Sequence, residues 1–275
     1  MTGHLKFTGK PELQHPSLII AWSIDAGALG TNVTGYLNRK LGSQSFCQIE
    51  PLDFFPLGGV TIKDDLVQFP QNSFYASSGK DLIIFQSTPP GHEWYKFINL
   101  TLDVAEQYRV KEIYAIGGMI SLAAHTTPRM LVGTFNSPVL KGALSGYNLA
   151  PIMDYETPPG QRPTISSYFI WAAGKRNIPG VSLWVPIPFY LLNVNDPRAQ
   201  KKVLDFFNQR FSLGMDLNDL DDEIRLQNQI IAELRNSFPE IDRSITRLES
   251  NLGLSEEDSH NLVNEIAKFL RQKRG

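Results

Sequence analysis

Short apolar runs alternate with segments of helical periodicity through the first three quarters of the chain. Ser17–Trp22 reads SLIIAW, an uninterrupted apolar run typical of a strand buried on both faces of a parallel sheet. Thr31–Leu41 follows with apolar residues four positions apart, which predicts a helix. Further strands are predicted at Phe46–Ile49, Asp81–Phe85, Glu112–Ile116, Met130–Phe135 and Val181–Val185, and further helices at about His92–Tyr108, Ser166–Arg176 and Asp196–Phe211.

This alternation determines the expected fold class. Strands that alternate with helices predict an α/β fold with a largely parallel sheet flanked by helices. Two apolar segments at residues 59–62 and 66–69 flank Lys63, Asp64 and Asp65, which predicts a tight hairpin turn. Pro197 stands in the first turn of its predicted helix, where a missing N–H costs no hydrogen bond.

The pattern changes after Gly214. From Leu217 to Leu252 apolar residues recur at alternating spacings of three and four, a heptad seam with Gln227 as its one polar member. Pro239 predicts a break in this seam, with Ser237 placed to cap the helix that follows. We therefore expect an α/β core domain at residues 1–214 and a C-terminal helical subdomain at residues 215–275. The seam either folds back on its own chain or pairs with another copy.

Composition and charge exclude several functional classes. Of 275 residues, 42% are hydrophobic and 20% charged, and the net charge of −2 gives no electrostatic footprint for nucleic acid or an anionic membrane. Cys47 is the only cysteine, and no Cys/His cluster has the spacing of a metal site. The N-terminal residues lack the pattern of a signal peptide, and no apolar run is long enough to span a membrane. We expect a cytoplasmic protein without a metal or cofactor.

The segment WSIDAGALGTNV, residues 22–33, joins the first strand to the first helix. It contains Gly27 and Gly30 but neither the G-x-G-x-x-G fingerprint of dinucleotide sites nor the lysine of a phosphate-binding loop. Asp25 carries the wrong charge for a phosphate at a helix N-terminus and is placed to cap that helix. Two interpretations remain open: the small residues allow close packing, or they contact a ligand.

A second group of candidates follows the strand predicted at Glu112–Ile116. Gly117 and Gly118 stand at its carboxyl end, where open α/β sheets place ligands, although a simple tight turn fits as well. His125, in the loop AHTTPRM, suits either proton chemistry or a structural hydrogen bond. A ligand crevice would accordingly be lined by Asp25, Gly27, Gly30, Gly117, Gly118 and His125. No residue qualifies as catalytic or metal-binding.

Two tryptophans outside these loops have a simpler expected role. Trp171 lies in the helix predicted at Ser166–Arg176, and Trp184 lies in the strand predicted at Val181–Val185. Both are expected in the core or at a subunit interface, with an aromatic platform for a ligand as the alternative.

The order of these segments resembles the proteasome assembly chaperone 2 family. The resemblance rests on IIAWSIDAGALGTNVTGYL, DFFPLGG, EIYAIGG, AHTTPRM, GVSLWVPIPFYL and NEIAKFLRQ, in this order along nearly the whole chain. It implies an α/β fold like that of nucleoside phosphorylases without their catalytic residues. It also implies self-association and a role as an assembly factor or partner of the proteasome.

The chain departs from this family at its last residues. Some members end in a hydrophobic-Tyr-any-residue tail that docks into the proteasome, whereas this chain ends Gln-Lys-Arg-Gly. Docking by that route is therefore not expected. Members have also been labelled ATP-grasp or carboxylate–amine ligase-like, but this sequence has no recognisable set of lysines for phosphates and carboxylates for magnesium.

Two functional hypotheses follow. The first is a non-enzymatic, oligomeric binding or assembly protein whose C-terminal helices contact the proteasome or other protein subunits. The alternative is a small-molecule- or nucleotide-binding enzyme or sensor that uses the crevice.

Overall fold

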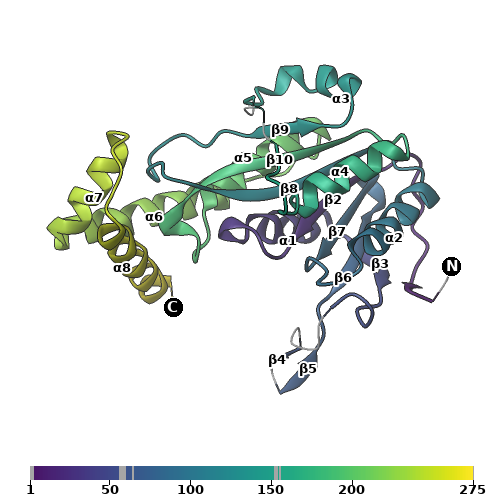
Figure 1. Ribbon diagram of the computed structural model, residues 1–275, viewed down its shortest axis with the longest axis horizontal. Coiled ribbons are helices and arrows are strands. Elements are labelled where there is room, and N and C mark those ends of the chain that lie inside the picture. Colours follow the sequence, from purple (N-terminus) through teal and green to yellow (C-terminus); the bar gives the residue numbers. More distant parts are fainter. Residues whose placement is uncertain (1–2, 56–59, 64, 152–153, 155, 275) are drawn as a thin grey trace. The chain divides into compact units, whose positions relative to one another are not determined.

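A computed structural model describes residues 3–55, 60–63, 65–151, 154 and 156–274 of the chain. Asp64 of the predicted hairpin turn and residues 56–59 of the DFFPLGG segment lie outside the described residues. Within the described residues, eight strands form one sheet in the order β1-β3-β6-β7-β2-β8-β10-β9, flanked by helices (Figure 1). The α/β class is therefore confirmed.

The elements follow the predicted alternation closely. The strands of the large sheet are β1 (Leu5–Phe7), β2 (Ser17–Trp22), β3 (Gln44–Ile49), β6 (Asn72–Ser77), β7 (Leu82–Ser87), β8 (Glu112–Ser121), β9 (Val132–Phe135) and β10 (Gly180–Pro188). The helices are α1 (Leu29–Leu41), α2 (Trp94–Gln107), α3 (Pro138–Ala143), α4 (Ile165–Lys175), α5 (Pro197–Arg210), α6 (Asn218–Ser237), α7 (Pro239–Glu249) and α8 (Glu256–Arg274). The predicted hairpin is confirmed as β4 (Thr61–Lys63) paired with β5 (Leu66–Gln68). Short 3₁₀ helices include η1 (Ala26–Ala28) and η5 (Phe189–Leu191).

The sheet is mixed. β2 pairs in parallel with both β7 and β8, whereas β1, β3, β6 and β7 follow one another with antiparallel pairing. β6 was not predicted because polar side chains occupy several of its buried positions. Asn72 donates to the Ile49 carbonyl oxygen at 3.4 Å and accepts from the Ser87 hydroxyl at 2.8 Å, so the strand needs no continuous apolar run.

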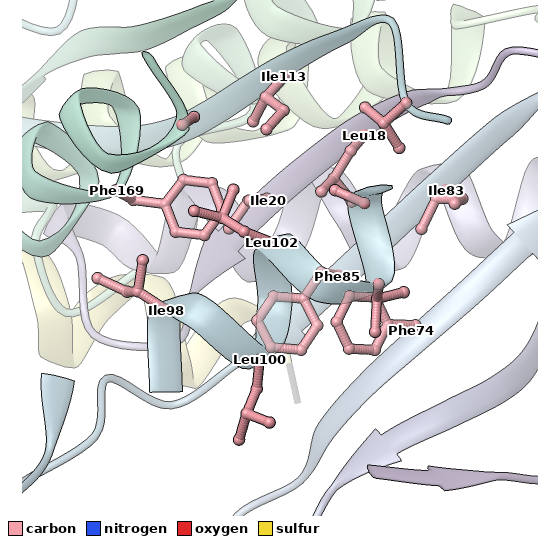
Figure 2. Close-up of a cluster of buried hydrophobic side chains, with 14 of the residues drawn as sticks. Leu18, Ile20, Phe74, Ile83, Phe85, Ile98, Leu100, Leu102, Ile113 and Phe169 are labelled. Carbon is pink, nitrogen blue, oxygen red and sulfur yellow. The ribbon is translucent and has the colours of Figure 1, made fainter. Parts of the chain in front are cut away.

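α2 and α4 lie side by side on one face of the sheet (Figure 1). Figure 2 shows the buried cluster beneath them, in which Phe169 of α4 and Leu102 of α2 lie close to Ile20 of β2. Phe74 and Phe85 from neighbouring strands stack in the same cluster, with ring centroids 4.2 Å apart. A core built from such large side chains is the main source of stability for this part of the chain.

α1 lies on the opposite face of the sheet. Side chains alternate along β7, so Gln86 points away from the face that Phe85 occupies. The Gln86 side chain donates to the Thr34 hydroxyl of α1 at 2.7 Å, and Val33 and Leu37 of α1 are fully buried. The strand–helix alternation thus produces a sheet with helices on both faces, as predicted.

The chain forms two compact units, each assembled from separate segments. The first contains the described residues of segments 1–24, 33–117 and 132–183, and the second those of 25–32, 118–131 and 184–275. The second unit therefore joins the C-terminal helices to two short loops from much earlier in the sequence. The boundary near Gly214 stays a prediction.

The C-terminal helices pack against one another in the second unit. α6 packs against α5, α7 and α8, and α8 packs against α7 and η5 (Figure 1). The break predicted at Pro239 is confirmed, because α6 ends at Ser237 and α7 begins at Pro239. Ser237 does not cap α7, however, since its hydroxyl donates back to the Glu233 carbonyl oxygen at 2.9 Å. Apart from its last member, Leu252, which is 53% exposed, the apolar seam packs within the chain in this structure.

Gln227, the polar member of the seam, has a partner inside the second unit. Its side chain is 2% exposed and donates to the Asn195 carbonyl oxygen at 2.8 Å. The Asn195 side-chain oxygen also accepts a hydrogen bond from the Asn32 side-chain amide at 3.0 Å, and its side-chain amide donates to the Gln200 side-chain oxygen at 3.3 Å. The seam is polar at this position because α6 covers a loop whose backbone oxygen needs a donor.

Candidate functional site

The loop between β2 and α1 folds around the carboxylate of Asp25. Its Oδ2 accepts hydrogen bonds from the backbone N–H of Gly30 at 2.9 Å and of Gly118 at 2.8 Å. Gly30 lies in the first turn of α1, so Asp25 satisfies one of the free amides there, as the sequence suggested. The second bond shows that the same oxygen ties the start of α1 to β8.

The two glycines of the EIYAIGG segment lie inside a strand. β8 continues from Glu112 to Ser121, so the alternative of a tight turn at Gly117 and Gly118 is wrong. β2 pairs with β8 only as far as Ile116, and the glycines lie just beyond that point. A Cβ on Gly118 would stand 2.1 Å from the Ala26 carbonyl oxygen. Gly118 is therefore required because the loop backbone of the same chain presses against it.

Gly27 is required for a different reason. Its φ of 67° lies in the left-handed region, which glycine adopts without a steric penalty. A Cβ there would also touch Ile187 at 3.4 Å. Ala28, the next residue, holds a φ of 49° although it has a Cβ. The loop thus contains two successive left-handed residues, one of them conformationally costly.

Asp25 is electrostatically perturbed. Burial raises the pKa of its carboxyl from 3.8 to about 6, and the amides of Gly30 and Gly118 offset part of that rise. Its Oδ1 is buried and has no hydrogen-bond partner among the described residues. One oxygen of the carboxyl thus accepts two backbone N–H groups and the other is buried without a partner; because burial disfavours the charged form, the carboxyl is protonated below about pH 6.

His125 is held by Tyr190 of the PIPFY segment, a partner that was not predicted from the sequence. The Tyr190 hydroxyl oxygen accepts from the His125 backbone N–H at 2.5 Å and lies 2.9 Å from its Nδ1. Since that oxygen already accepts one proton, its own O–H is free to donate to a neutral Nδ1. His125 is 5% exposed, and burial lowers its pKa to about 4, with Arg235 and Arg129 adding to the effect of burial.

A buried ion pair completes the surroundings of this loop. Arg129 lies 2.9 Å by its Nε and 2.8 Å by its Nη2 from Oδ2 of Asp196, and both side chains are almost fully buried. Oδ1 of Asp196 caps α5 by accepting from the Ala199 N–H at 3.1 Å. The sequence signal for this pair was Asp196 before Pro197, a common helix start. The position of Arg129 was not foreseeable, because the loop brings it in from a distant segment.

The structure therefore brings together only part of the predicted crevice. Asp25, Gly27, Gly30 and Gly118 form one hydrogen-bonded and closely packed group. The hydrogen bonds of His125 go to Tyr190 instead. Whether these residues contact a ligand stays a prediction.

Two surface hollows lie away from these residues. One, of about 970 Å³, is lined by residues that include Lys10, Asp81 and Arg109. The other, of about 470 Å³, lies at the start of α2 and includes Trp94 and Tyr168. Neither lining contains a residue of the predicted crevice. Both volumes are within the usual range for small-ligand pockets.

The described residues contain neither a metal-binding cluster nor a membrane-spanning helix. In that part of the chain no three His, Cys, Asp or Glu side chains cluster closely enough to hold a metal ion. None of the described helices combines the length and apolar character needed to cross a membrane.

Comparison with known proteins assigns the chain to a family. The sequence profile of the PAC2 family matches residues 19–235, and no curated protein matches the chain. Among solved structures the chain is similar to a Mycobacterium tuberculosis protein of unknown function, with 19% identity, a TM-score of 0.78 and 91% of each chain covered.

Two further similar structures have names that refer to the proteasome. Pyrococcus furiosus PbaB, an archaeal proteasome activator, matches with 20% identity and a TM-score of 0.67, covering 84% of this chain and 98% of its own. A Mycobacterium tuberculosis proteasome-assembly chaperone homologue matches with 19% identity and a TM-score of 0.66, covering 79% of this chain and 94% of its own. At these identities the structures show a shared fold, whereas the profile covers most of the sequence. The chain belongs to the PAC2 family.

Proposed function

We propose that the chain is a non-enzymatic, oligomeric binding or assembly protein of the cytoplasm. Its family supports this proposal, because similar structures include a proteasome activator and a proteasome-assembly chaperone homologue. By analogy with them, the partners are further copies of the chain and protein subunits such as those of a proteasome. The helices α6, α7 and α8 would present the surface that contacts those subunits.

One observation supports the non-enzymatic part most directly. The residues that were the best candidates for catalysis or ligand binding make contacts within the protein itself. Asp25 accepts hydrogen bonds from two backbone N–H groups, and Gly118 packs closely against the Ala26 carbonyl oxygen. His125 is buried against Tyr190 with its pKa near 4, well below the pH at which a general base is most useful.

Among the described residues of the C-terminal helices and their connections, two large apolar side chains are exposed, and one of them is Leu252, the last member of the seam. Leu226 on α6 is 45% exposed, and Leu252 after α7 is 53% exposed. The rest of the seam is buried or half-buried within the chain, so a partner would contact the outer surface, and these two leucines would be its apolar anchors. A matched control is Val139, which is 81% exposed on α3, far along the sequence from these helices.

The test is quantitative affinity capture from the native host, with mass spectrometry and light scattering for oligomer mass. The full chain is compared with L226S combined with L252S, and with V139S. We expect the double variant to lose specific protein subunits while V139S retains them. If the double variant recovers every subunit unchanged, the C-terminal helices are not the contact surface. If light scattering shows a monomer at working concentration, the chain does not self-associate.

A small-molecule function is the second candidate, and the Asp25 loop favours it. Oδ1 of Asp25 is buried without a partner, and Ala28 holds a costly left-handed conformation beside it. A ligand that donates a hydrogen bond to Oδ1 would satisfy that oxygen. Thermal unfolding with nucleosides, nucleotides and inorganic phosphate tests this, because a ligand at 100 times its Kd adds about 2.7 kcal/mol. No shift in the transition with any of these compounds would count against this candidate.

A further inference from the structure

Three aromatic side chains form a row at the surface where α2 and α4 begin: Trp94 and Tyr168 are half-buried, and Trp171 is exposed. Trp94 and Tyr168 line the same hollow of about 470 Å³. Trp171, one turn further along α4, stacks on Tyr168 with ring centroids 5.5 Å apart and planes inclined by 22°. Trp171 is 52% exposed and so is not part of the core, contrary to one expectation from the sequence. Trp94, Tyr168 and Trp171 are called the aromatic row below.

Two cations stand over the rings of this row. The guanidinium of Arg162 lies 5.9 Å from the centroid of the Trp94 ring, and the Lys175 ammonium lies 5.3 Å from that of Trp171. Within the described residues neither cation forms an ion pair or a hydrogen bond. Arg176, the neighbour of Lys175, is by contrast engaged with Asp103 at 2.7 Å and Glu106 at 3.0 Å. Among the described residues, therefore, neither of the two cations beside the row is paired with a carboxylate.

The helices that hold the row are fixed in place by packing and by hydrogen bonds between them. α2 and α4 contact one another, and Phe169, between the row residues of α4, is fully buried in the core. The Arg176 side chain joins the two helices, because it donates to Asp103 and also to the Asn99 side chain at 2.6 Å. A preformed surface of this kind loses little conformational entropy when a partner binds.

The arrangement of the rings indicates which partner fits. One face of the Tyr168 ring is covered by Trp171, and Lys175 and Arg162 cover faces of Trp171 and Trp94. Stacked nucleobases need open ring faces, so the row is a poor platform for single-stranded nucleic acid. Aromatic side chains that line a hollow suit proline or aliphatic side chains, and cations without a carboxylate partner attract carboxylates.

We propose that the aromatic row, with Arg162 and Lys175, binds an acidic peptide segment that contains proline or aliphatic residues. This rests on the proposed function as a protein-binding protein and names the chemistry of one partner. Glu93 also lines the hollow and opposes an acidic ligand. The site is therefore a modest, salt-sensitive contact, and its affinity falls as ionic strength rises.

The test uses displayed peptide pools of defined composition and the full-length chain. One pool contains only acidic, proline and aliphatic residues, a second replaces the acidic residues with lysine, and a third replaces the apolar residues with glycine and serine. Selected peptides are labelled with a fluorophore, and their Kd is measured by fluorescence anisotropy at two salt concentrations. A fluorescent oligothymidylate is measured beside them.

We expect enrichment from the first pool only. R162Q and K175Q should each raise the Kd of the selected peptide about two- to fivefold, the usual effect of one exposed charge pair. W171A should raise it about tenfold, as expected for an aromatic anchor. E93Q should leave the Kd unchanged or lower it, and K111Q, at an exposed lysine of the same unit, should have no effect.

Other outcomes overturn the inference. No enrichment from the first pool, or a selected peptide whose Kd is the same for W171A, would exclude the row as a peptide site. Tighter binding of the oligothymidylate would favour nucleic acid instead. If W171A retains every subunit captured from the host, the row fails while the proposed binding function stands. If the wild-type chain captures no specific protein subunits from the host, the proposed function itself is wrong.

Discussion

Replacing Gly118 with alanine would test how tightly the Asp25 loop packs against β8. The new methyl group would stand 2.1 Å from the Ala26 carbonyl oxygen and 3.0 Å from a side-chain carbon of Ile187. The carbon and the oxygen would have to separate by about 1 Å, since heavy atoms at this distance repel strongly. Both neighbours belong to packed structure, so neither can rotate away as a flexible side chain would.

The energetic cost has two parts. Overpacking of a rigid site costs about 1–3 kcal/mol. Displacing the backbone would also lengthen the hydrogen bond from the Gly118 N–H to Asp25, now 2.8 Å, and a hydrogen bond to a charged group contributes about 1.5–3 kcal/mol. We expect G118A to lose about 3 kcal/mol. For a chain of 275 residues this lowers the melting temperature by about 6–12 °C.

The assay is thermal unfolding of G118A and of a matched glycine variant, followed by circular dichroism. Gly35 lies inside α1 with nothing within 4 Å of its potential Cβ, so G35A should leave stability unchanged or raise it by about 1 kcal/mol. If G118A melts within about 2 °C of the wild-type chain, the close approach of the loop to β8 is not a constraint on stability.

Four further predictions concern polar groups of the second unit. Burial raises the pKa of Asp25 to about 6, so the stabilisation linked to its bound proton is complete below pH 4 and lost above pH 6. As the pH rises between these values, the unfolding free energy of D25N should gain about 2–3 kcal/mol relative to that of the wild-type chain. A difference in unfolding free energy that stays constant with pH would contradict this. Burial lowers the pKa of His125 to about 4, so its contribution to stability is present above pH 6.5 and lost as the pH falls toward 4, and an NMR titration of the ring should show a midpoint well below 6. Y190F should cost about 1–3 kcal/mol because it removes the acceptor of the His125 N–H, and a variant as stable as the parent would refute that role. Q227A should cost about 2 kcal/mol in chemical denaturation, whereas Q229A, exposed on the same helix, should cost less than about 0.5 kcal/mol; equal effects would show that the bond to Asn195 is unimportant.

Local patterns were sufficient where one element determines its own structure. The apolar run at Ser17–Trp22 became β2 with the same bounds. Asp196 before Pro197 became the start of α5, with the Asp196 side chain as its cap. Pro239 broke the seam where its ring cannot continue a helix. Each of these features depends on backbone sterics or hydrophobic period within a few residues.

Two features were not predicted correctly, for different reasons. Ser237 had the right residue type for a cap of α7, but its hydroxyl donates to the Glu233 carbonyl oxygen, four residues earlier in its own helix. β6 escaped notice because Asn72 is satisfied by Ile49 and Ser87 on neighbouring strands. Such partners lie many residues away, and no local periodicity reveals them.

By itself, the sequence determined the α/β class, the order of the elements and the resemblance to the PAC2 family, because these depend on hydrophobic period and on ordered motifs. Tertiary structure decided the roles of the candidate residues. Only folding brings Asp25 within 2.8 Å of the Gly118 N–H and His125 within 2.9 Å of the Tyr190 hydroxyl oxygen. Hydrogen bonding and desolvation act over a few ångströms in space, whatever the separation along the chain, and so they cannot be read from residue order.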